Sequence, residues 1–119
     1  MEIGATEQTS RSFAAKDVAD YVELGGQMPA DGLLPEPLIG AMFSYLLGVK
    51  LPGMGTMYLK QESEFKAAAR VGETLVARVE ITRVRSEKHL VDLRTTCHND
   101  KGDLICDGRA LVYVKDVQQ

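Results

Sequence analysis

The segment from Pro37 to about Val49 constrains the fold more than any other part of this chain, because it predicts an almost wholly apolar helix. Pro37 suits the first turn of a helix, where its missing N–H is not needed. Apolar side chains then occur around the whole circumference, with no charge before Lys50: Leu38, Ile39, Met42, Phe43, Tyr45, Leu46 and Leu47. A helix that is apolar on every side is buried on every side. The sequence therefore predicts a central helix enclosed by the rest of the domain.

Strand patterns fill the chain after this helix. We expect strands over Thr56 to Phe65, Thr74 to Val84, His89 to His98 and Asp103 to Lys115, separated by short polar turns. Alternation of apolar and polar residues is clearest between Leu75 and Thr82. Four strands in succession with such short turns predict a long antiparallel meander.

The segment before the apolar helix adds a strand and a helix. The residues through Ser12 predict a short strand, and Ala14 to Leu24 a helix that Gly25 and Gly26 end. Gln27 to Pro35 contains two prolines and few periodic signals, which is typical of a loop. Residues 1–119 therefore predict one α+β domain, in which an antiparallel sheet wraps around a central apolar helix.

Size and charge exclude several classes of protein. A chain of 119 residues builds one core and is too short for two. The net charge of -3, with Lys and Arg scattered among acids, argues against nucleic acid as a partner. No apolar run is long enough to span a bilayer, and Met1 to Gly4 lacks the regions of a signal peptide. We expect a cytoplasmic protein with no membrane partner.

Cysteine and histidine give no sign of a metal site or a cofactor. Cys97 and Cys106 flank a predicted hairpin turn, so a cross-strand disulfide is conceivable, but two buried and unpaired thiols are the favoured interpretation in a reducing compartment. His89 and His98 would lie on opposite faces of one strand. Because a metal site needs clustered ligands, we expect no metal and no cofactor.

Two stretches of the sequence resemble a known family. The first reads EPLIGAMFSYLLGVKLPGMGTMYLKQESEF from Glu36 to Phe65, and the second reads VGETLVARVEIT from Val71 to Thr82. Together they resemble the MaoC-like, (R)-specific enoyl-CoA hydratase branch of the hot-dog fold, over most of the chain. The resemblance implies a homodimer with the acyl site between subunits, and an acyl-CoA or acyl-carrier-protein thioester as the ligand.

The segment that would carry the family's acid–base residues differs here. In the family a DxNPxH pattern after the first helix activates the water that adds to an enoyl thioester. In the matching segment Gln27 stands about where the Asp should be, and no His follows. We therefore expect the usual acid–base pair to be lost or replaced. Asp31 is the leading candidate for a relocated catalytic group, and Glu36 is the other acid nearby, although such carboxylates more often form turns or cap helices.

Other site residues follow from the same resemblance. It places Ser44 on the family's helix serine in the acyl site, as a catalytic candidate that polarises the thioester carbonyl. Gly40, Ser44 and Gly48 share one helix face, which allows either the close approach of a thioester or simple packing against a sheet. Gln27 could bind the carbonyl but cannot take a proton.

Tyr58 is the remaining substrate-binding candidate, because its strand matches a family stretch near the acyl pocket. Regular alternation places it on one side of that strand with three charged residues, and four other residues on the opposite side. The side with Tyr58 holds Lys60, Glu62 and Glu64, and the other holds Met57, Leu59, Gln61 and Ser63.

Several functions remain open at this stage. The first is a lyase of the enoyl-CoA hydratase or dehydratase type with an altered acid–base group. The second is a non-catalytic acyl-binding protein or partner subunit, or a biosynthetic enzyme with a repurposed pocket. The third is an acyl-CoA thioesterase, which is the weaker hypothesis because the central helix carries no acid between Pro37 and Lys50.

Overall fold

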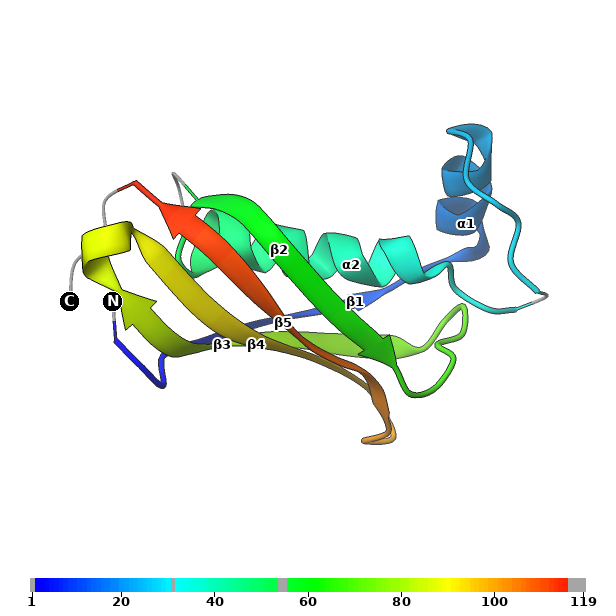
Figure 1. The fold of residues 1–119 in the computed structure, drawn as a ribbon. Helices are drawn as coiled ribbons and strands as arrows, with labels where there is room; N and C mark the ends of the chain where they lie inside the picture. Colours follow the sequence, from blue (N-terminus) through cyan, green and yellow to red (C-terminus); the bar gives the residue numbers. More distant parts are fainter. Residues whose placement is uncertain (1, 31, 54–55, 116–119) are drawn as a thin grey trace.

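A computed structural model describes residues 2–30, 32–53 and 56–115, which form a five-stranded sheet curved around a helix (Figure 1). The elements are β1 (Thr6–Ser12), α1 (Ala15–Glu23), α2 (Glu36–Tyr45), β2 (Thr56–Phe65), β3 (Thr74–Arg85), β4 (Leu90–Asn99) and β5 (Leu104–Val114). All neighbouring strands are antiparallel, in the order β1-β3-β4-β5-β2. This arrangement confirms the predicted α+β class and leaves β1 and β2 as the two edges of the sheet.

The core lies between α2 and the inner face of the sheet. Buried residues of α2 and its last turn recur at helical spacing: Ile39, Met42, Phe43, Leu46 and Leu47. They pack with the alternate residues of β3 that the sequence pattern predicts: Leu75, Ala77, Val79 and Ile81. Such spacing of three and four residues places a single apolar stripe of α2 against the sheet.

The prediction that the central helix is buried on every side is wrong within one chain. Tyr45 is 47% exposed and Val49 59% exposed, on the side of the helix away from the core. The helix also ends differently, because α2 stops at Tyr45 and a π-helical turn over Leu46–Lys50 continues it. One five-stranded sheet covers only one side of a helix, so an apolar stripe containing Ala41, Tyr45 and Val49 stays open to solvent.

The predicted alternation along β2 is also wrong, because a bulge interrupts it. The register of β2 against β5 shifts between Tyr58 and Lys60, which leaves Leu59 as an extra residue. Tyr58 is paired with the buried Val112 and faces the inside of the sheet, whereas Lys60 is paired with Leu111 and faces outward. Tyr58 therefore lies on the opposite face from Lys60, Glu62 and Glu64.

The turn between β3 and β4 contains His89, which the sequence pattern places in a strand. His89 is not a strand residue but sits in a left-handed turn, with a φ of 57°, after a short 3₁₀ turn at Ser86–Lys88. Its Nδ1 lies 3.1 Å from the carbonyl oxygen of Val114, which ties the turn to the end of β5. His98 is on β4 and exposed. The two histidines thus have different structural environments rather than opposite faces of one strand.

Candidate functional site

Two hydroxyl groups meet where the end of α2 faces the edge strand β2. Ser44 lies near enough to Tyr58 to lower the pKa of its hydroxyl, although the sequence separates them by a π-helical turn and a loop. Burial raises the pKa of Tyr58, and the hydrogen bond with Ser44 lowers it by less. The Tyr58 hydroxyl therefore stays protonated at neutral pH and can donate a hydrogen bond to a ligand.

The helix face that carries Ser44 is open. A Cβ atom built on Gly40 or Gly48 would have no non-local atom within 4 Å. Ser44 itself is exposed, and Tyr58 is 37% exposed. These side chains line none of five hollows found elsewhere on the described residues. In the single chain the pair therefore forms an open surface rather than an enclosed pocket.

The remaining predicted residues lie in the connection between α1 and α2. Gln27 is exposed there, and among the described residues no hydrogen bond joins its side chain to Ser44 or Tyr58. Asp31, the leading catalytic candidate, lies outside the described residues. The structure thus brings Ser44 and Tyr58 near each other, and the roles of Gln27 and Asp31 stay predictions.

A small apolar hollow lies at the start of α2 and was not anticipated from the sequence. Its volume is about 250 Å³, and its walls come from the α1–α2 connection, the start of α2, and the end of β2 with the residues after it: Pro29, Leu33–Pro35, Ile39, Phe65 and Ala67–Ala69. Glu36, the first residue of α2, is part of the wall. In the sequence, Glu36 lies close to three prolines and two leucines. That these residues surround a space depends on how the connection packs, which the sequence pattern does not show.

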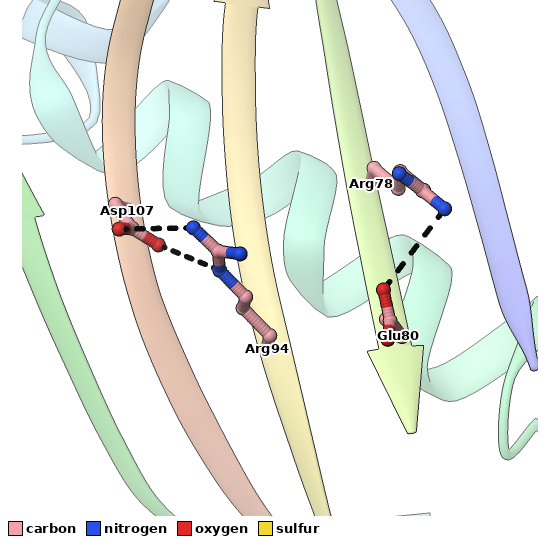
Figure 2. A network of polar contacts seen from close by, with 4 residues as sticks. All are labelled: Arg78, Glu80, Arg94 and Asp107. Carbon is pink, nitrogen blue, oxygen red and sulfur yellow. Dashed lines mark hydrogen bonds and ion pairs between the residues drawn. The ribbon is translucent and has the colours of Figure 1, made fainter. Parts of the chain in front are cut away.

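A larger hollow lies on the outer face of the sheet and is shallow and charged. Its volume is about 510 Å³, and Arg94 and Asp107 form part of its wall. The guanidinium of Arg94 forms two hydrogen bonds with the Asp107 carboxylate, at 3.3 and 3.4 Å, as Figure 2 shows together with the nearby pair of Arg78 and Glu80. Asp107 raises the pKa of Arg94. These four charged side chains form two ion pairs on a solvated face of the sheet. Because each is paired with an opposite charge, none of the four is a candidate catalytic group.

The described residues contain neither a cluster of metal ligands nor a membrane-spanning helix. In the ranges 2–30, 32–53 and 56–115, no three or more His, Cys, Asp or Glu side chains gather closely enough to hold a metal ion. No helix in those ranges has the length and hydropathy needed to cross a bilayer.

The architecture defines the class of the protein, since a curved antiparallel sheet around one central helix is the hot-dog fold. The (R)-hydratase of Aeromonas caviae involved in PHA biosynthesis superposes with a TM-score of 0.91 over 96% of this chain and 97% of that chain, at 30% identity. A Streptococcus pneumoniae hypothetical thioesterase with coenzyme A superposes with a TM-score of 0.76 at 9% identity, over 100% of this chain and 85% of that chain, which shows the shared fold alone.

Sequence comparison narrows the class to a family. The chain is 32% identical over 126 residues to the (R)-specific enoyl-CoA hydratase of Aeromonas caviae, covering 94% of each sequence. It is 40% identical over 85 residues to the enzyme of that name from Rhodospirillum rubrum, covering 71% of this chain and 56% of the relative. No family model matches the chain. The chain belongs to the MaoC-like, (R)-specific enoyl-CoA hydratase family.

Proposed function

We propose that this protein binds acyl thioesters of CoA or of an acyl carrier protein, and that it catalyses reversible addition of water to the enoyl form. The contact between Ser44 and Tyr58 carries this proposal, because it places two hydroxyl donors beside a helix face that glycines keep open. A thioester offers carbonyl and amide oxygens that such donors can bind. A cytoplasmic location is part of the proposal and is testable by cell fractionation.

The proposed site divides into two parts. Ser44 and Asp31 belong to the catalytic part, and Gln27, Gly40 and Tyr58 to the part that binds the substrate. Hydration requires a group that takes a proton from water, and the chain's single Asn is Asn99, so the family's Asn-Pro motif is absent from the whole sequence. Hydration by this chain therefore requires another carboxylate, such as Asp31 in the connection between α1 and α2 or Glu36 at the first position of α2.

We further propose that a second copy of the chain completes the site. The exposed stripe of α2 borders one edge strand, since Ala41 and Tyr45 share a hollow with residues 9–11 of β1. The other edge strand, β2, has unpaired backbone groups and exposed apolar side chains. Met57 is 62% exposed and Leu59 53% exposed on that strand. Exposed apolar patches and long strand edges are usually covered by a partner. A homodimer across this side would enclose Ser44 and Tyr58, which the single chain leaves open.

The test combines binding and turnover. We would titrate the purified protein with saturated and trans-2-enoyl-CoA thioesters in a calorimeter, and follow the same mixtures by mass spectrometry. We expect binding that weakens about fivefold in Ser44→Ala, because one hydrogen bond is worth about 1 kcal/mol. We also expect a product heavier by one water. Absence of binding to every thioester would refute the proposal.

A non-catalytic acyl-binding role is the second candidate, and the missing family motif favours it. This role predicts thioester binding with no change in ligand mass. Release of free CoA would instead indicate a thioesterase.

A further inference from the structure

The hollow at the start of α2 contains one ionisable group among the residues that the structure places around it. The other wall residues are apolar: Pro29, Leu33, Leu34, Pro35, Ile39, Phe65 and Ala67–Ala69. Its volume of about 250 Å³ is smaller than the roughly 300–1,000 Å³ of sites that take a drug-sized molecule. It therefore suits a short segment of a ligand, such as the few carbons next to a thioester.

The backbone on both sides of Glu36 is conformationally restricted. Pro35 precedes it as the helix N-cap and Pro37 follows it, so both flanking φ angles are fixed. Within the described residues no hydrogen bond or ion pair holds the Glu36 carboxylate. Other acids near the ends of strands and helices have structural partners, as when Asp17 accepts the N–H of Ala14 at 2.7 Å and Glu73 that of Arg70 at 2.7 Å. The Glu36 carboxylate is free to engage a ligand.

The hollow and the hydroxyl pair lie along one row of the same helix. Glu36, Gly40 and Ser44 follow each other at intervals of four residues, which forms a continuous ridge on a helix surface. At a rise of about 1.5 Å per residue, Glu36 and Ser44 are about 12 Å apart along the axis. The open position at Gly40 connects them. One extended thioester can therefore contact Ser44 and Tyr58 with one part and reach Glu36 with another.

From this arrangement we propose that Glu36, in place of Asp31, is the general base of the site and acts on the reacting carbons of an enoyl thioester. Ser44 and Tyr58 then bind a different part of the same molecule, and Ser44 has a substrate-binding role in place of the catalytic one. The inference rests on the proposed function. A water proton passes to the Glu36 carboxylate as the water oxygen bonds to C3. The electron pair of the C2=C3 double bond moves to C2 and the thioester carbonyl. The protonated Glu36 then returns the proton to C2, which restores the carboxylate and gives the 3-hydroxyacyl thioester.

The experiment compares Glu36→Gln, Glu36→Asp and Asp31→Asn with the unaltered protein. The probe is trans-but-2-enoyl-CoA, with turnover followed by loss of enoyl absorbance and affinity by calorimetry. A positioned base contributes about 10²–10⁴-fold to rate. We therefore expect Glu36→Gln to lower kcat by about that factor while the Kd changes less than about threefold, and Glu36→Asp to recover part of the activity. The acidic limb of the pH–kcat profile should disappear in Glu36→Gln.

Glu87→Gln is the matched control, because Glu87 is an exposed acid in the 3₁₀ turn away from this hollow. It should retain full turnover, and circular dichroism should confirm that every variant is folded. A Glu36→Gln protein with kcat within threefold of the unaltered protein overturns the inference, and loss confined to Asp31→Asn assigns the proton to Asp31 instead. A protein that binds the thioester without hydrating it also refutes a base role for Glu36, while acyl binding itself stands.

Discussion

The two cysteines show how burial lowers the reactivity of a single side chain. Cys97 and Cys106 lie directly opposite each other on β4 and β5, and both are buried and unpaired, which confirms the prediction of free thiols. Burial raises the pKa of Cys97 to about 12, and the neighbouring Cys106 adds to this effect. Burial also raises the pKa of Cys106. Because the thiolate is the reactive form, these residues act as small apolar side chains rather than nucleophiles.

This pKa shift predicts a loss of stability at high pH. The folded state holds the Cys97 proton more tightly than the unfolded state, so this contribution to stability is complete below the ordinary thiol pKa of 9.0 and is lost as pH rises toward about 12. We expect Cys97→Ala to be less stable at neutral pH but to lose less free energy of unfolding across that range. Urea unfolding at a series of pH values measures it. An equally steep decline in Cys97→Ala would show that the thiol is not its source.

At the scale of elements, one buried amide joins the β4–β5 hairpin to the start of β3. The Asn99 side chain is 8% exposed in relative area, and its Nδ2 donates to the carboxylates of Glu73 at 3.1 Å and Asp103 at 3.2 Å. Its Oδ1 accepts the backbone N–H groups of Lys101 and Asp103. The two carboxylates tolerate this proximity because an amide with two N–H donors lies between them.

Replacing that amide by a carboxylate should destabilise the hairpin. Asn99→Asp removes both donors and adds a negative charge beside two others, so we expect a loss of about 2–4 kcal/mol in the free energy of unfolding. Chemical denaturation measures the effect, and Asp100→Asn on the exposed turn is the control, with an expected change within about 0.5 kcal/mol. Equal stability of the two variants would contradict this role for Asn99.

Local sequence patterns predicted most of the helices and strands, but they did not predict which side chains of neighbouring elements lie close together. The limits of β2 match the prediction because Pro52 and Gly53 precede a clear strand pattern and a polar turn follows it. The contact of Tyr58 with Ser44 was not predictable from alternation, because a bulge depends on the register of the partner strand. The hollow beside Glu36 likewise depends on how a loop packs. Hydropathy alone also could not tell whether the sheet or another chain covers each side of α2.

At the scale of the whole molecule, one sheet cannot cover the central helix, and the remaining apolar surface predicts association. Leu59→Glu places a charge on the exposed part of β2, where burial of a leucine in an interface is worth about 1.5–3 kcal/mol. We expect the dimer dissociation constant to rise by at least about tenfold, measured by light scattering across a dilution series. Leu24→Glu, at a leucine 89% exposed at the end of α1, is the control and should leave the dimer intact. A monomeric unaltered protein would contradict the proposed dimer.

The bulge at Leu59 has a consequence for how variation can act on this fold. The inserted residue puts the two halves of β2 out of phase, so that Tyr58 faces the helix whereas Lys60 and Glu62 face solvent. Deleting Leu59 would restore a regular strand and leave these side chains on their present faces. Deleting a residue on either side of the bulge would shift one half of the strand by one position and exchange its two faces. We therefore expect β2 to tolerate substitutions far better than changes of length, because its length determines the face on which Tyr58 lies.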